Sequence, residues 1–524
     1  MKKMRTNRII YKRGGGLLSV VLLSLGLSLM SSCEEWLDVR GENIQKEQDQ
    51  FEDYKGFRDV LTGCYMSLGS TDIYGQRLTM TDIESLADLW YNTSSYENNY
   101  PDKYYLSIHD YSKDEPRVAI KAIYGGLFNT IATANVILKN IEEKGNNITN
   151  SKARNVIEGE ALAIRAYCQL DVLRMFGQLP NGGTKTVNLP YSYTTSIDEM
   201  PAWYGYNKYV ELLTADITKA EELLKGSDPI FDMTFTQLNN PGSTAEDEFL
   251  YYRQARLNYW AVRALHARMA LYTGQKAEAH KIAMDIINAK GADGNALISL
   301  SGISDLQKGY NGLPSECLFY LSKYDLKTYA NRLLIGGNDT QSRDVNYTLS
   351  ANMLTDLYAS IPNATASHNR YLNLWNQNTK NTSQRVTPSL KKYWYDDNNM
   401  SSTLVSSNAN ELVTKFQIIP MLRLSEIYLI AMETSTDLAE AQSLYDTYMT
   451  SCSFTLYEPF SSLEDLQTEL VNEYRRELFG EGQMFFTYKR LGATKMLWNN
   501  NVIKEDDYIV PLPATEFDPA LLNQ

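Results

Sequence analysis

An early stretch of the chain, residues 71–105, combines aromatic rings with side chains that form forked hydrogen bonds. Flat rings can stack on the C–H faces of sugars, while carboxylate, amide and guanidinium groups bind the hydroxyls. The residues that offer this combination are Asp72, Arg77, Trp90, Tyr91, Asn92, Tyr96 and Asn98. We predict that they bind a polar ligand. The alternative is that the rings only cover the top of the scaffold.

The middle of the chain, residues 291–420, supplies a second set of candidates. Its composition shifts to Gly, Asn, Ser, Thr and Tyr, with few long periodic runs. Long loops on a rigid scaffold commonly carry binding residues. We add Tyr324 and Trp375 from this region to the predicted ligand-binding set.

Charged residues are dense between Glu473 and Arg490. Paired carboxylates can serve as the acid and base of a glycosidase. However, arginines beside them would hold both carboxylates ionised and leave no proton donor. Beside Leu478 and Phe479 such charges would be costly unless they were paired. We therefore predict structural Arg–Glu pairs here, and no catalytic residues.

The sequence contains no motif for common enzyme chemistry. It has no GxSxG elbow, P-loop, HExxH or Rossmann glycine set, and only four histidines. Cys64, Cys168, Cys317 and Cys452 are far apart and form no CxxC pair, which predicts single buried thiols. We expect no cofactor and no metal site.

The first residues predict export from the cytoplasm. A basic start is followed by a mostly apolar run from Leu17 to Met30, which is too short to span a bilayer, and then by Ser31, Ser32 and Cys33. We predict a signal peptide over residues 1–32. Without the six basic residues of this leader the chain has 44 basic and 63 acidic residues, a net charge of −19. Such a surface repels nucleic acid.

Most of the remaining chain has helical periodicity. The stretch from Glu158 to Pro180 has apolar or small residues on two faces, which predicts a helix buried on two sides. Gly177 suits a left-handed position at its end. A helix–turn–helix over residues 258–289 resembles a tetratricopeptide unit. Further helices are expected at 52–66, 121–144, 206–225, 421–434, 437–449 and 463–478.

Two segments of the middle region predict a small sheet. Residues 316–324 alternate in polarity, and they could pair with residues 412–419. Polar turn-forming residues after Trp90 predict loop as far as residue 105. The expected fold is therefore mainly α, a scaffold of helical hairpins with long loops and small β elements.

Several motifs resemble the SusD/RagB family of bacterial surface nutrient-binding lipoproteins. Cys33 after two serines looks like a lipobox, and Trp36-Leu37-Asp38 is similar to the start of mature family members. The strongest matches lie at residues 473–492 and 508–521. The helix near residue 160 and the segment at 423–429 also resemble the family. They include Glu160, Ala161, Arg165, Phe176, Gly177, Arg423, Glu426, Glu473, Arg476, Glu477, Glu481, Lys489 and Arg490.

This resemblance implies a fold, a place and a function. It implies a single SusD-like domain over residues 33–524, with an N-terminal part to about 290, a variable part over about 291–420 and a C-terminal part from about 421. It implies lipidation of Cys33 and anchoring to the outer membrane, facing the cell exterior. The implied function is capture of a glycan for a TonB-dependent SusC-like transporter. A peptide-binding member of the family or a glycan-degrading surface enzyme remains the alternative.

Overall fold

The computed structural model describes residues 49–196, 199–242, 247–335, 347–377, 387–395 and 409–517. The predicted signal peptide and the predicted lipidation site, Cys33, lie outside the described residues. Within these ranges, no helix combines the length and the apolar composition that crossing a bilayer requires.

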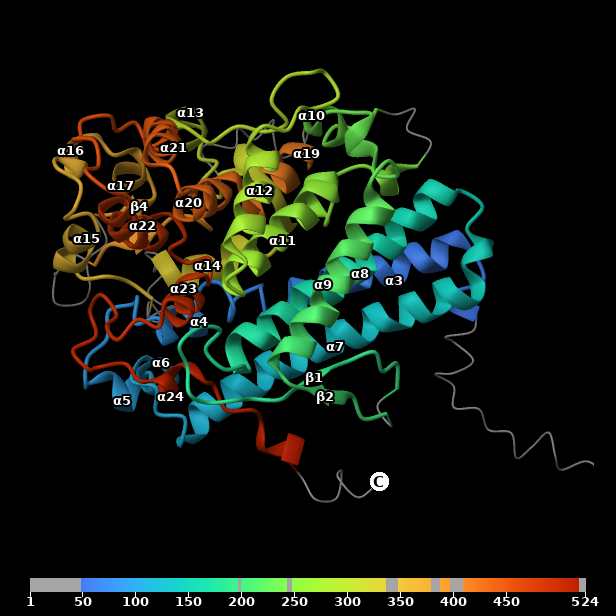
Figure 1. Ribbon diagram of the computed structural model, residues 1–524, viewed down its shortest axis with the longest axis horizontal. Coiled ribbons are helices and arrows are strands. Elements are labelled where there is room, and N and C mark those ends of the chain that lie inside the picture. Colours follow the sequence, from blue (N-terminus) through green and yellow to red (C-terminus); the bar gives the residue numbers. More distant parts are fainter. Residues whose placement is uncertain are drawn as a thin grey trace, which may run out of the picture.

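Long helices form a stack that runs across the molecule, from the N-terminal helices on the right to the C-terminal ones on the left (Figure 1). Each contacts the next, from the first helix to the C-terminal part, so the predicted scaffold of helical hairpins is confirmed. The members are α3 (Tyr54–Leu68), α7 (Asp114–Lys144), α8 (Ser151–Phe176), α9 (Tyr206–Leu224), α11 (Tyr259–Tyr272), α12 (Lys276–Ile287), α20 (Leu424–Thr434), α21 (Leu438–Ser451) and α22 (Leu463–Glu477).

Helix α8 is the centre of this stack. Every residue from Gly159 to Phe176 is buried, as its two apolar faces predict. A Cβ on Gly159 would lie 2.8 Å from Leu224 Cγ of α9, so only glycine allows this close helix contact. The prediction that Gly177 takes a left-handed backbone conformation is wrong. Its backbone is extended, with φ −74° and ψ 172°, and glycine is needed because a Cβ would lie 2.4 Å from the Leu173 carbonyl oxygen.

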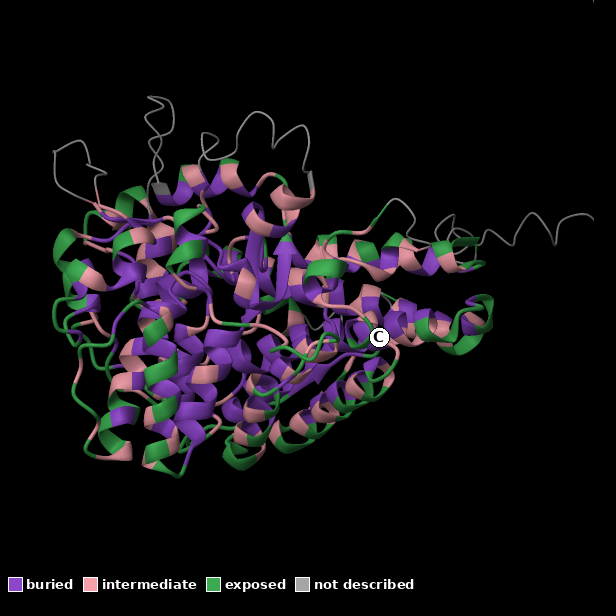
Figure 2. Cartoon of the chain, turned by 90° about the horizontal axis from the view of Figure 1, so that it is seen from above, coloured by how far each residue is buried: buried purple, intermediate pink, exposed green. Residues whose placement is uncertain are grey.

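The buried residues run through the middle of the molecule, and exposed residues occupy the outer helix faces and the loops (Figure 2). Cys64, Cys168, Cys317 and Cys452 are all buried and free, so the prediction of single buried thiols is confirmed.

Three short antiparallel pairs of strands lie among the helices: β1 (Leu189–Tyr191) with β2 (Ala202–Tyr204), β3 (Cys317–Ser322) with β6 (Ile418–Arg423), and β4 (Trp375–Asn376) with β5 (Ser389–Leu390). The prediction that residues 316–324 pair with residues 412–419 is partly wrong. Pairing begins at Ile418, because Leu412–Phe416 forms a π-helical turn (η7). Strand β6 then occupies the start of the helix predicted at 421–434, and α20 begins at Leu424.

Short helices cover the end of the stack where the chain is less periodic (Figure 1). Two of them occupy the predicted loop before residue 105. Pro101 starts the second, since the missing N–H of proline costs nothing in a first turn. The short helices at this end are α4 (Asp82–Leu86), α5 (Tyr96–Asn99), α6 (Pro101–Ser107), α14 (Leu326–Ala330), α15 (Ala351–Leu357), α16 (Ala364–Ser367), α17 (Asn369–Asn373), α23 (Met484–Leu491) and α24 (Glu505–Tyr508).

A buried charge network joins the middle region to the C-terminal helices. Arg423, at the end of β6, is 1% exposed. Its guanidinium lies 2.6 Å from Glu477 and 2.7 Å from Glu481, and it also contacts Glu316. Around these carboxylates lie two further cations, Arg370 and Lys392. We call these six residues the Arg423 network.

Other charged residues of the same C-terminal segment are paired in the same way. Arg476 lies 2.6 Å from Glu473, and Arg490 lies 2.5 Å from Glu433. The predicted pairing of arginine with glutamate is confirmed for Arg476 and Arg490. Arg475 instead donates to Tyr488 and Asn472, and Lys489 donates to backbone carbonyl oxygens.

Replacing Arg423 with methionine should strongly destabilise the protein, because Glu316, Glu477 and Glu481 would lose their central partner while still buried. Breaking a buried pair costs about 3–5 kcal/mol. The control is Lys208→Met, which removes an exposed partner of Glu211 and should cost less than about 1 kcal/mol. Urea unfolding followed by circular dichroism measures both. Equal losses in the two variants would contradict a special role for the network.

Candidate functional site

A compact turn after α3 carries Asp72 and Arg77. Gly75 makes the turn possible, since a Cβ there would lie 2.3 Å from the Gly69 carbonyl oxygen. Arg77 Nε lies 3.6 Å from Asp72 Oδ1, and the same guanidinium donates to the buried carboxylate of Asp82. Burial raises the pKa of Asp82, and the charge of Arg77 opposes that rise. Asp72 keeps 56% of its side chain exposed, so a carboxylate is held at the surface by a fixed guanidinium.

Trp90 and Trp375 do not lie at the surface. They are 2% and 4% exposed, and both pack edge-to-face on Phe479, with ring centroids 4.9 and 5.0 Å away. The indole N–H of Trp90 donates to the Met80 carbonyl oxygen at 3.0 Å. A buried ring cannot offer its face to a sugar. The structure therefore corrects the assignment of these two tryptophans to the ligand site and places them in the core.

The segment after Trp90 forms a half-buried row of tyrosines. Tyr91 and Tyr96 pack edge-to-face with centroids 6.1 Å apart, and Tyr96 packs on Tyr100 at 5.1 Å. The ammonium of Lys103 lies 4.9 Å from the centre of the Tyr96 ring. Burial lowers the pKa of Lys103 to about 7, so part of this charge is lost near neutral pH.

The two asparagines of this segment differ in their surroundings. Asn92 is half-buried and donates to Ser107 Oγ, while its own Oδ1 is buried and has no hydrogen-bond partner among the described residues. Asn98 is exposed in α5. Both amides therefore keep hydrogen-bonding capacity beside the tyrosine row.

Tyr324 is the most exposed large hydrophobic or aromatic side chain in the described part of the chain, at 85%. Its backbone is fixed, because Gln417 Nε2 donates to the Tyr324 carbonyl oxygen at 3.2 Å and the Lys323 N–H donates to the Gln417 carbonyl oxygen at 2.8 Å. The ring thus projects into solvent from a rigid base.

Hydrogen bonds join the Tyr324 loop to the early segment. The Tyr329 hydroxyl, on α14, donates to the Gly75 carbonyl oxygen at 2.8 Å, between Asp72 and Arg77. The Tyr91 N–H donates to the Thr348 carbonyl oxygen at 3.0 Å. The predicted residues of the early and middle regions therefore belong to two segments that pack on each other.

The buried carboxylate of Glu477 is held ionised, so it is not suited to donate a proton. Burial alone would raise the pKa of Glu477, but Arg370 and Arg423 outweigh it and hold that pKa well below the ordinary value. In the described ranges, no group of three His, Cys, Asp or Glu side chains is arranged as metal ligands.

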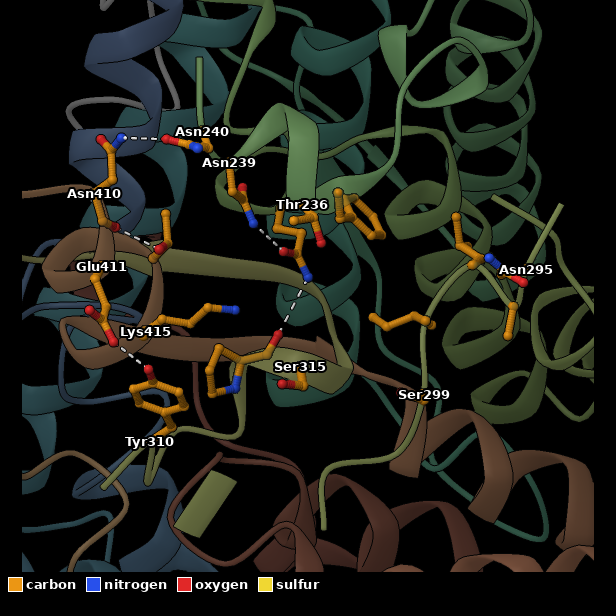
Figure 3. A pocket seen from close by; sticks show the side chains of 17 residues that line it. Thr236, Asn239, Asn240, Asn295, Ser299, Tyr310, Ser315, Asn410, Glu411 and Lys415 are labelled. Atoms are coloured by element: carbon orange, nitrogen blue, oxygen red, sulfur yellow. Dashed lines mark hydrogen bonds between the residues drawn. The ribbon is translucent and has the colours of Figure 1, made fainter. Parts of the chain in front are cut away.

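A pocket of about 560 Å³ lies between the end of η7 and α10 (Phe235–Leu238) (Figure 3). It was not predicted, because its lining residues come from separate stretches of the sequence and form no motif. They lie near residues 235–240, 254, 295–299, 310–315 and 410–415.

Comparison with known proteins supports the fold through structure rather than sequence. No family model and no curated protein sequence matches the chain. A SusD superfamily protein from Bacteroides thetaiotaomicron VPI-5482 is 19% identical with a TM-score of 0.65, covering 89% of this chain and 98% of that one.

Two further solved structures are similar over most of their length. A SusD-like carbohydrate binding protein from Bacteroides vulgatus ATCC 8482 is 18% identical with a TM-score of 0.58, covering 84% of this chain and 83% of that one. A laminarin binding SusD-like protein is 15% identical with a TM-score of 0.59, covering 89% and 97%. The chain therefore has the SusD-like fold that its sequence motifs predict.

Proposed function

We propose that this protein is a surface lipoprotein that captures a glycan and delivers it to a TonB-dependent outer-membrane transporter. The observation that carries the proposal is the exposed ring of Tyr324 on a rigid base, in a segment that packs on the one carrying polar groups suited to sugar hydroxyls. The proposed ligand residues are Asp72, Arg77, Tyr91, Asn92, Tyr96, Asn98 and Tyr324.

The similar structures support a carbohydrate as the ligand, since one is described as carbohydrate binding and another as laminarin binding. Stacking on Tyr324 would cover one face of a sugar, and Asp72 and Arg77 would bind hydroxyls by forked hydrogen bonds. Binding at a surface ring desolvates little area, so we expect weak affinity for a single sugar unit and tighter binding of a polymer.

A glycan-degrading enzyme is the less favoured reading. Glu473 and Glu477, two carboxylates of the charged C-terminal segment, are buried and paired with arginines. A peptide ligand remains the alternative within the same fold, and the binding experiment includes it.

Tyr324→Ala should weaken polysaccharide binding about fivefold or more, because an exposed aromatic anchor commonly contributes at least about 1 kcal/mol. The measurement is affinity electrophoresis of the soluble form that starts after Cys33, against a panel of polysaccharides and peptides. The matched control is Tyr193→Ala, which removes another exposed tyrosine, 46% exposed beside β1. Unchanged retardation of a folded Tyr324→Ala protein, or retention by peptides alone, would count against the proposal.

Cys33→Ala should release the protein from membranes, because the lipid chains on this thiol and its amine would be the anchor. Fractionation of cells expressing each form measures the membrane-bound share. Continued sedimentation of the variant with membranes would rule out lipidation at Cys33 as the anchor.

A further inference from the structure

The pocket in Figure 3 has two chemically different walls. One wall is apolar, formed by Phe235, Leu297 and Ile298, which belong to a small hydrophobic cluster around Ile230 and Leu238. The rest of the lining, here called the polar wall, includes amides, a phenol and two charged side chains. Its volume of about 560 Å³ lies within the range of about 300–1,000 Å³ that is common for small-ligand sites.

The amides of the polar wall are held in place. Asn239 Nδ2 donates to Gln254 Oε1 at 2.6 Å, and Gln254 Nε2 donates to the Cys317 carbonyl oxygen at 2.6 Å. The Tyr252 hydroxyl donates to Asn410 Oδ1 at 2.6 Å. Because their orientations are fixed before a ligand arrives, these amides need little ordering on binding.

One polar atom of this wall has no partner. Asn239 Oδ1 is buried and accepts no hydrogen bond from the described residues. A buried acceptor without a donor carries a free-energy cost that a ligand hydroxyl would remove.

The two charged groups of the pocket differ in their surroundings. Glu411 accepts a hydrogen bond from the Tyr310 hydroxyl, whereas the side chain of Lys415 extends into the pocket (Figure 3). No carboxylate of the described residues lies within 4.0 Å of the Lys415 ammonium. Burial lowers the pKa of Lys415, although Asp305 and Glu411 act in the opposite direction. Of the two charged groups, the lysine is therefore the one that reaches into the pocket.

We propose that this pocket is a second ligand site, and that it takes an acidic sugar unit of the hexuronate class. The carboxylate of the sugar binds Lys415, its hydroxyls bind the amides of Asn239 and Asn410, and its C–H face packs on Phe235 and Leu297. An anion beside a partly desolvated ammonium forms a charge-assisted hydrogen bond, which is stronger than a neutral one.

The pocket shares no lining residue with the proposed surface at Tyr324. The η7 turn contacts both places: Lys415 of the turn lines the pocket, and Gln417, directly after the turn, donates to the Tyr324 carbonyl oxygen. Binding of an acidic sugar in the pocket depends only on the residues that line it. It does not require that a polysaccharide bind at Tyr324.

The test is calorimetric titration of the soluble form that starts after Cys33 with digalacturonic acid and with its methyl ester. The ester keeps the hydroxyls and removes the negative charge. The acid should bind at least about tenfold more tightly than the ester, and Lys415→Met should weaken binding of the acid by about tenfold or more. Lys276→Met removes an exposed lysine of α12 and should change nothing.

A second variant should have the opposite effect on the affinity for the acid. Glu411→Gln keeps an acceptor for Tyr310 but removes a negative charge from the pocket, so it should strengthen binding of the acid severalfold. Tyr324→Ala should leave the acid affinity unchanged, which separates this site from the proposed surface. The comparison of acid with ester in the unmodified protein holds even where Lys415→Met fails to fold.

Equal affinity for acid and ester, equal affinity of Lys415→Met and the unmodified chain, or no saturable binding at millimolar concentrations would each overturn the proposal. Displacement of the acid by an acidic peptide that binds more tightly would overturn the sugar class. Loss of acid binding in Tyr324→Ala would place the acid at the other surface instead.

Discussion

The structure depends on burying Arg423 among carboxylates. A lone buried guanidinium would be very costly, so Glu316, Glu477 and Glu481 must all be in place when it leaves water. Glu316 directly precedes β3, Arg423 ends β6, and Glu477 ends α22. The network therefore fixes the strand pair that carries Tyr324 to the helices of the C-terminal part. Buried charged side chains therefore help to position the exposed ring of Tyr324.

The helical stack and the irregular segments have different roles. Helix α8 is buried over most of its length and allows close contacts through Gly159, which makes the stack rigid. The exposed aromatic, the tyrosine row and the mixed-polarity pocket all lie on short helices and loops attached to it. Rigid support of this kind lowers the ordering cost of ligand contacts.

Periodicity was enough to predict the long helices, since a helix such as α9 buries one stripe that repeats in the sequence. It could not locate the start of β6, where a π-helical turn replaces the expected strand. It also could not separate exposed rings from buried ones. Trp90 is covered by Phe479, almost four hundred residues away, and no local pattern reports that contact. Asp72 and Arg77 were chosen for their side-chain chemistry and Tyr324 as an aromatic residue of the variable region, and the structure leaves Asp72 and Tyr324 exposed.

The central claim is that a glycan binds where the Tyr324 loop packs on the segment after α3. Hydrogen–deuterium exchange of the soluble form, with and without a bound polysaccharide, tests it most directly. The account predicts slower exchange in residues 70–105 and 323–330 when the polysaccharide is present, with little change along α8 and α9. Protection confined to other parts of the chain would contradict it.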